Sequence, residues 1–264
     1  MKIGFIGTGV ISDAIVRGLM KSDTEMSFLL SRRSESLSER LANEFSNVEV
    51  VDDNQAIIDA SDVVVLAVRP QVAEAVLAGL TIPPEKQVIS LIATLTHDTL
   101  RSWFGTEVSI CRAIPLPFVA DQIGITAIYP DQAAAKTLFT LLGTVVAATS
   151  QVEFDRYGIA SATMGLYFET VSTLSEWIIK EGVPESHSQL YFSALLHGLN
   201  QTALKQNETS FRDQVAAHST PGGLNEQAVS VFKQQGGPEA LVCALESIKA
   251  RILANSAPNP KEPK

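Results

Sequence analysis

The residues that build metal centres and disulfides are scarce in this chain. Its 264 residues include two cysteines, Cys111 and Cys243, and four histidines, and their spacing matches no zinc site. We therefore expect no bound metal. The two cysteines can form at most one bridge, but we favour two reduced, buried thiols, because free cysteine is among the most buried residue types.

Long apolar runs and excess positive charge are also missing. No apolar stretch reaches the roughly 20 residues that a transmembrane helix needs. The opening MKIGFIGTG passes directly into a strand and a glycine turn, unlike a signal peptide. We expect a cytoplasmic protein with no membrane partner. The net charge of −9 argues against a nucleic-acid partner, although a local basic pocket for one phosphate is compatible with it.

The first half of the chain alternates between short apolar segments and segments with helical periodicity. Hydrophobic residues make up 45% of the sequence, which is enough for a large core. Residues 62–68, DVVVLAV, are continuously apolar, as expected of a parallel strand covered on both faces. We predict an α/β fold with a Rossmann-type, doubly wound parallel sheet over residues 1–150. Its strands are predicted at 2–6, 27–30, 48–51, 62–68, 88–93, 108–113, 123–129 and 145–148, and its helices at 12–20, 36–45, 97–103 and 132–142.

After about residue 150 the pattern becomes helical. Tyr167, Val171, Leu174 and Ile178 share one helix face, and further helical segments follow, including 190–204 and 241–252. Wide apolar helix faces need a partner to cover them. We therefore predict an all-helical domain over 151–254 that binds substrate and pairs two subunits as a homodimer. The polar, proline-rich residues 255–264 are predicted to be a disordered tail.

A glycine-rich loop follows the first predicted strand. Gly7 and Gly9 occupy the first two positions of the dinucleotide-binding pattern G-x-G-x-x-G, and Ser12 occupies the third. The first glycine allows a tight turn, the second lets a pyrophosphate approach the backbone, and the third position needs a small residue. The next helix then directs its free N–H groups at the phosphates. We predict that a dinucleotide contacts Gly7, Thr8, Gly9, Val10 and Ile11.

The end of the second predicted strand indicates which dinucleotide binds. NAD-binding units tend to place an acidic residue about 20 residues after the glycine loop. This chain has Ser31, Arg32 and Arg33 there, and their hydroxyl and guanidinium groups suit a ribose 2′-phosphate. We therefore predict NADP(H) as the cofactor. The alternative is that either arginine is only a solvated surface charge.

Later strand ends are expected at the same edge of the sheet, because ligands of such sheets bind beyond the carboxyl ends of the strands. The fourth strand ends in AVRP, and we predict that this segment walls the cofactor site. The segment 112–117, RAIPLP, ends a later strand and is predicted to lie under the nicotinamide. For both segments a plain turn is the alternative. The predicted wall consists of Ala67, Val68, Arg69 and Pro70.

In order along the chain, these segments resemble the pyrroline-5-carboxylate reductase family. The matching stretches are GFIGTGVISDAIVRGL, SRR, DVVVLAVRPQ, VISLIA, CRAIPLP and RDQVAAHSTPGG, which together span almost the whole chain. The resemblance implies an NADPH-binding Rossmann domain, a helical domain that interlocks two subunits, and metal-free hydride transfer to a C=N carbon. It also implies that Ala93, at the end of VISLIA, and Pro115 line the cofactor.

The substrate half departs from the family pattern. The family reads M-P-N-T-P where residues 114–118 read IPLPF, so Leu116 replaces its asparagine. Its G-S-G-P-A segment corresponds to ATMGL at 162–166. Its functional threonine aligns with Asn225. The resemblance therefore extends more closely to the cofactor half than to the substrate half.

The segment 218–225, HSTPGGLN, is the predicted substrate loop. Two glycines before a predicted helix leave bare N–H groups at its positive end, which suits a substrate carboxylate, and Thr220 is predicted to cap that helix. Asn225 is predicted to hydrogen-bond the substrate. His218 is a candidate proton donor, because its ordinary pKa is near the working range, and Ser219 and Thr220 offer hydroxyl groups instead. The predicted substrate contacts are Thr220, Gly222, Gly223, Leu224 and Asn225, and the predicted catalytic residues are Asn225, Thr220 and His218.

These observations lead to an expected function with two alternatives. The leading hypothesis is NADPH-dependent reduction of a small cyclic imino acid, pyrroline-5-carboxylate or a relative. The altered substrate loops favour, as the first alternative, a reductase for another imine or oxo acid. The second alternative is a protein that binds NADPH without catalysis, which the replaced polar residues would suit.

Overall fold

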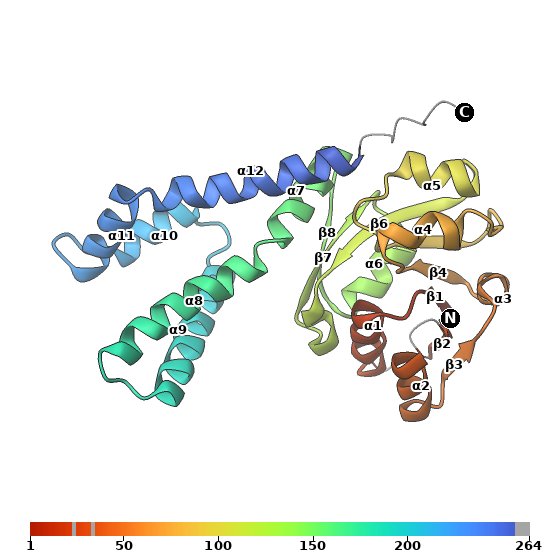
Figure 1. Ribbon diagram of the computed structural model, residues 1–264, viewed down its shortest axis with the longest axis horizontal. Helices are drawn as coiled ribbons and strands as arrows, with labels where there is room; N and C mark the ends of the chain where they lie inside the picture. The colour runs from red at the N-terminus through yellow and green to blue at the C-terminus, as the bar shows by residue number, and fades with distance from the viewer. Residues whose placement is uncertain (23–24, 33–34, 257–264) are drawn as a thin grey trace. The chain divides into compact units, whose positions relative to one another are not determined.

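The structure is a computed structural model that describes residues 1–22, 25–32 and 35–256 (Figure 1). Arg33 and residues 257–264, to which two of the predictions above refer, lie outside the described residues. The chain forms two compact units, one comprising residues 1–161 with the chain from 251 onward, the other comprising residues 162–250. Each unit is described by itself below.

The first unit is built on a single eight-stranded sheet with the strand order β3-β2-β1-β4-β5-β6-β7-β8. All eight predicted strands are present, and the reversal of strand order beside β1 is that of a doubly wound fold. The strands are β1 (Lys2–Ile6), β2 (Ser27–Ser31), β3 (Val48–Val51), β4 (Val63–Leu66), β5 (Gln87–Ser90), β6 (Ser109–Pro115), β7 (Gly124–Tyr129) and β8 (Gly143–Ala147).

One strand pair departs from the predicted parallel sheet. β7 runs antiparallel to β6, while every other neighbouring pair is parallel. The connection between β6 and β7 contains only the short 3₁₀ helix η1 (Pro117–Asp121). A parallel return needs a crossover of about a dozen residues or more, so this connection is too short to provide one.

Helices cover both faces of the sheet. The predictions missed α3 (Asn54–Ala60) and α4 (Pro70–Leu77), which are too short to show a clear apolar period. Their starts nevertheless carry recognisable signals, since Asp53 accepts a hydrogen bond from the Gln55 N–H and Pro70 opens α4. The predicted helices appear as α1 (Val10–Met20), α2 (Glu35–Glu44), α5 (His97–Phe104) and α6 (Ala133–Thr140), and α7 (Gln151–Ser161) completes the unit.

The two large core clusters of the first unit form layers, one on each face of the sheet, and a small third cluster lies around Phe154. Successive side chains of a strand point to opposite faces, so Phe5 packs in the layer with Ile15 of α1, whereas Ile6 packs in the layer with Leu77 of α4. This two-sided burial is the physical reason for the continuous apolar strands. Cys111 lies in the first layer, and burial raises the pKa of its thiol to about 12.

The second unit consists of helices with little burial of their own. Its elements are α8 (Met164–Lys180), α9 (Glu185–Lys205), α10 (Phe211–His218), α11 (Leu224–Gln234) and most of α12 (Gly237–Ser256). Ser188 is the only buried residue between 162 and 250, a range that the structure describes completely. Cys243 is exposed, so the prediction of two buried thiols is right for Cys111 and wrong for Cys243 in the single chain. Among the described residues, no helix has the length and apolarity to cross a membrane.

Candidate functional site

The glycine loop between β1 and α1 has the geometry that its sequence predicts. Gly7 has a φ of +102°, and a Cβ atom there would lie 2.6 Å from the backbone carbonyl of Ala67. Only glycine fits both conditions. At Gly9, by contrast, no heavy atom lies within 4 Å of the position of a Cβ. Gly9 is also the N-cap of α1 and provides no side-chain cap, so the first-turn N–H groups remain available to an anion.

Three hydroxyl groups hold this loop in place. The Gly7 N–H donates to Oγ of Ser31 at 2.8 Å, and Oγ1 of Thr8 donates to the Ser31 carbonyl at 2.9 Å. Ser12, which replaces the third glycine, is fully buried and donates its hydroxyl to the Gly7 carbonyl at 2.8 Å. Ser31 therefore fastens the loop to the end of β2, a structural task in addition to the cofactor contact that we predicted for it.

Arg32 follows directly at the end of β2 and lies at the surface. Its guanidinium forms ion pairs with Glu39 of α2, at 3.0 Å, and with Asp52 after β3. All three side chains are more than two-fifths exposed. Exposed pairs of this kind contribute only about 0–1 kcal/mol, so a bound phosphate can replace them at small cost.

The remaining predicted cofactor residues lie along the same edge of the sheet. The register aligns Ile6, Leu66, Ser90 and Arg112 across four neighbouring strands. The segments that continue past these residues are therefore brought together beyond the strand ends. They carry Gly7, Ala67 to Pro70, Ala93 and Pro115, of which Arg69 and Ala93 are exposed and Pro115 is buried.

Arg112 is a residue of this edge that the predictions had not singled out. It is only 3% exposed, and its Nη2 donates to the Ala93 carbonyl at 2.8 Å. Its Nη1 lies 3.6 Å from Asp155 of α7, and the guanidinium carbon lies 4.7 Å from the Phe154 ring centre. Burial lowers the pKa of Arg112, and Asp155 opposes that shift. A charged residue within the apolar strand SICRAIP was the available signal.

In the second unit, the predicted substrate loop joins α10 to α11. Gly223, and not Thr220, is the N-cap of α11, so the predicted cap is wrong. Thr220 instead accepts the Gly223 N–H through its backbone carbonyl, at 2.8 Å. Asn225 donates from Nδ2 to the His218 carbonyl at 2.9 Å, and Nδ1 of His218 lies 2.8 Å from the Gln214 carbonyl. Asn225 and His218 are thus close to each other, while Leu224 is 84% exposed.

A carboxylate of the chain already lies at this helix end. The Gly222 N–H donates to Oε2 of Glu226 at 2.7 Å, so in the single chain this N–H already has a carboxylate partner. The same contact means that a substrate carboxylate would have to displace Glu226 from Gly222. A cavity of about 370 Å³ adjoins the loop and is lined by Gly222, Gly223 and residues of α11.

Comparison with known proteins accounts for both halves of the chain. Residues 2–94 match the family model described as NADP oxidoreductase, coenzyme F420-dependent, and residues 156–254 match the one for pyrroline-5-carboxylate reductase dimerisation. The pyrroline-5-carboxylate reductase of Synechocystis sp. is 26% identical over 263 residues, covering 95% of this chain and 97% of the relative. The chain belongs to the pyrroline-5-carboxylate reductase family. The Escherichia coli reductase is 23% identical and covers 92% of this chain and 94% of its own length.

Solved structures of the reductase family share the fold over the full length. The reductase from Coxiella burnetii has a TM-score of 0.84 at 24% identity, covering 97% of this chain and 98% of its own. The Plasmodium falciparum enzyme, solved with NADP bound, has a TM-score of 0.82 at 17% identity with the same coverage. This reductase-family member therefore retains the architecture although about three-quarters of its residues differ from those of its relatives.

The anchoring role of Ser31 leads to a stability prediction. Ser31→Ala removes the acceptor of a buried N–H, which costs about 1–3 kcal/mol in the free energy of unfolding. Urea denaturation measures the loss. Ser102→Ala is the control, because Ser102 is exposed and its hydroxyl only donates within α5, and it should change stability by less than about 0.5 kcal/mol. Equal stability of the Ser31 variant and the parent protein would contradict the anchoring role.

Proposed function

We propose that the protein reduces pyrroline-5-carboxylate to proline with NADPH. The observation that carries this proposal is the glycine loop: open space at Gly9 and an uncapped start of α1 fit a dinucleotide pyrophosphate. Membership of the reductase family then supports the substrate class. The reductases of Synechocystis sp. and Escherichia coli, which this chain matches along nearly its whole length, carry that activity in their names.

The chemistry asks for positioning more than for strong acid–base groups. The cofactor, when bound, supplies a hydride to the carbon of the C=N bond. A substrate that binds as the iminium needs no further proton, because its nitrogen is already protonated. The chain's own residues then have to hold the substrate close to the cofactor in a water-poor cleft. Gly222 and Asn225 are the proposed substrate contacts, and His218, beside Asn225, is the proposed donor if the imine binds unprotonated.

Arg32 supports NADPH as the preferred cofactor. The charged partners of its guanidinium are surface carboxylates, which a ribose 2′-phosphate can replace with charge-assisted bonds of its own. Glu39 and Asp52 also hold the side chain at the end of β2, the position at which dinucleotide folds recognise the ribose.

The proposed active form is a homodimer paired through the second unit. Large apolar side chains there are exposed in the single chain, among them Leu174 at 46% and Trp177 at 63%. A helical unit that buries only Ser188 has no hydrophobic core of its own, and a second subunit can provide the missing contacts. The match of residues 156–254 to a dimerisation family supports the same arrangement.

A second candidate function is favoured by Glu226. Its carboxylate occupies the Gly222 N–H at the place proposed for the substrate carboxylate. A site that keeps this contact would suit an imine without a carboxylate group. The two candidates differ in substrate only, and both keep NADPH as the reductant.

The direct test is turnover by the purified protein, followed as the loss of NADPH absorbance with pyrroline-5-carboxylate. We expect Gly9→Ala to fold normally but to lose about tenfold or more in kcat/KM, because the new methyl group occupies the phosphate approach. Gly79→Ala is the control, since Gly79 also has no atom within 4 Å of a Cβ but lies after α4. NADPH binding without turnover would transfer the assignment to an imine without a carboxylate. Full activity of Gly9→Ala would contradict the cofactor site.

Cofactor preference tests Arg32. We expect Arg32→Ala to raise the Kd for NADPH by about tenfold and that for NADH much less, because only NADPH carries the 2′-phosphate. Arg40→Ala, in the exposed part of α2, is the matched control. Titrations of both cofactors measure the four Kd ratios. Equal losses for NADPH and NADH would refute the phosphate contact.

Light scattering after size exclusion tests the dimer. Leu174→Glu together with Trp177→Glu puts two charges on the apolar face of α8, and we expect the dimer to dissociate to monomers. Ser172→Lys is the control, since a five-residue offset places it roughly 140° around the helix from Trp177. A dimer that survives the double substitution would show that this face of α8 does not pair subunits.

A further inference from the structure

The segment between β5 and α5, residues 91–96, lies at the carboxyl ends of the strands, where ligands of open α/β sheets bind. The register aligns Ser90, the last residue of β5, with Arg112 of β6. In the strand order β2-β1-β4-β5, the segment lies two strands beyond the glycine loop, roughly 10 Å away at about 4.8 Å per strand. A dinucleotide with its ribose phosphate at Arg32 and its pyrophosphate at Gly9 therefore extends its nicotinamide half toward this segment.

The segment contains a turn that is fixed from two sides. A hydrogen bond of 3.1 Å from the Leu95 N–H to the Ile92 carbonyl closes the turn, and the Ile92 side chain is buried in the core on one face of the sheet. Ala93, the next residue, is exposed, and its carbonyl accepts a hydrogen bond from Nη2 of Arg112 at 2.8 Å. The position of the turn therefore depends on the core through Ile92 and on β6 through Arg112.

The guanidinium of Arg112 is held in its orientation by α7. Its carbon lies 4.7 Å from the ring centre of Phe154, and Nη1 lies 3.6 Å from Oδ1 of Asp155. Nε and Nη1 are buried and form no hydrogen bond with any described residue. A buried charge with unpaired donors is unfavourable for stability, and residues that break this rule are expected at functional sites. The hydrogen bond to Ala93 is therefore better explained by a role in the site than by a gain in stability.

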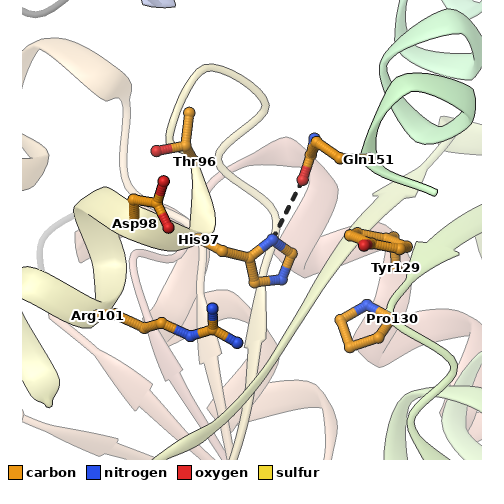
Figure 2. Close-up of a pocket in the computed structure, with 7 residues that line it drawn as sticks. All are labelled: Thr96, His97, Asp98, Arg101, Tyr129, Pro130 and Gln151. Atoms are coloured by element: carbon orange, nitrogen blue, oxygen red, sulfur yellow. Dashed lines mark hydrogen bonds between the residues drawn. The ribbon is translucent and has the colours of Figure 1, made fainter. Parts of the chain in front are cut away.

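The same helix also holds the end of the segment. Nε2 of Gln151 donates to Asp155 at 2.7 Å, and Oε1 of Gln151 lies 3.2 Å from Nδ1 of His97. Figure 2 shows this second contact, with His97 at the start of α5. His97 directly follows the segment 91–96 in the chain. The segment is therefore held at its middle through Arg112 and at its end through His97, and both contacts lead to α7.

We propose that Arg112 is a positioning residue of the cofactor site, which fixes the turn at Ala93 beside the nicotinamide half of the dinucleotide. This role rests on the proposed function, because it requires a bound dinucleotide. Arg112 is buried and acts through the Ala93 carbonyl, so it does not contact the cofactor itself. The adenosine half lies beyond β1 and β2 and is independent of this turn. Loss of Arg112 therefore weakens binding of the nicotinamide half alone.

Isothermal titration of the full-length protein with two ligands tests this role. NADPH spans both halves of the proposed site, whereas adenosine 2′,5′-bisphosphate carries the 2′-phosphate without the nicotinamide. We expect Arg112→Met to raise the Kd for NADPH by about tenfold, because the hydrogen bond from a charged donor to Ala93 is lost. The Kd for the bisphosphate should be unchanged. A purely structural role of Arg112 would not separate the two ligands.

A second variant tests the same role from α7. Asp155→Asn keeps Arg112 but removes the charge that orients its guanidinium, and we expect the Kd for NADPH to rise by about threefold with no change for the bisphosphate. Asp155 is partly exposed, so this variant decides the question if thermal melting shows that Arg112→Met does not fold.

Arg101→Met and Glu107→Gln are the matched controls, and both ligands should bind them as they bind the parent protein. Arg101 is an exposed arginine of α5, and Glu107 is an exposed carboxylate before β6, at the opposite edge of the sheet. Unchanged NADPH affinity of folded Arg112→Met, or of Asp155→Asn if the first does not fold, would overturn the proposal. Equal weakening of NADPH and the bisphosphate would also overturn it. A parent protein that binds NADPH without reducing pyrroline-5-carboxylate would refute the proposed function alone, because these Kd ratios do not depend on turnover.

Discussion

The close approach of two backbone segments at Gly7 is the constraint on which the nucleotide edge depends. The chain leaving β1 turns within contact of the chain leaving β4, so near that a single methyl group would collide with the Ala67 carbonyl. This approach starts α1 directly beyond β1 and points its free N–H groups past the end of the sheet. Ser31 then adds β2 to the same assembly through the Gly7 N–H. Three strand ends are in this way fixed relative to one another, those of β1 and β4 by close backbone approach and that of β2 through the Ser31 hydroxyl.

A second fixed point is the buried Arg112. Its guanidinium connects β6 to the segment after β5 through the Ala93 carbonyl, and to α7 through Asp155. The contacts continue from Asp155 through Gln151 to His97. A buried charge of this kind is expensive unless nearby groups compensate for it, and here the compensation comes from one carbonyl, one carboxylate and the face of Phe154. The network joins the predicted cofactor edge to the start of α5 through side chains within one unit.

The two units of the chain differ in how they are stabilised. The first buries both faces of its sheet and is complete as a single chain. The second leaves most of its apolar residues exposed, including Trp177 and Leu190, and in the proposed homodimer it is stabilised by contacts with the other subunit. The substrate loop belongs to this second unit. In the proposed homodimer, pairing of subunits and formation of the proposed substrate site are therefore linked, since both belong to the second unit.

The sequence alone determined the strands of the sheet, the glycine loop and the helical second half, because each depends on local chemistry or on a short period. Continuous apolar strands, the Gly7–Gly9 spacing and the i, i+4 stripes are readable without knowledge of distant contacts. Only the tertiary structure decided four other features. β7 pairs antiparallel with β6, Ser31 accepts the Gly7 N–H, Arg112 is buried, and Glu226 accepts the Gly222 N–H. The first three depend on which distant backbone group or charged side chain lies nearby in the fold, and residue type and spacing do not determine that. The Gly222–Glu226 contact spans only four residues and depends on the conformation of the loop.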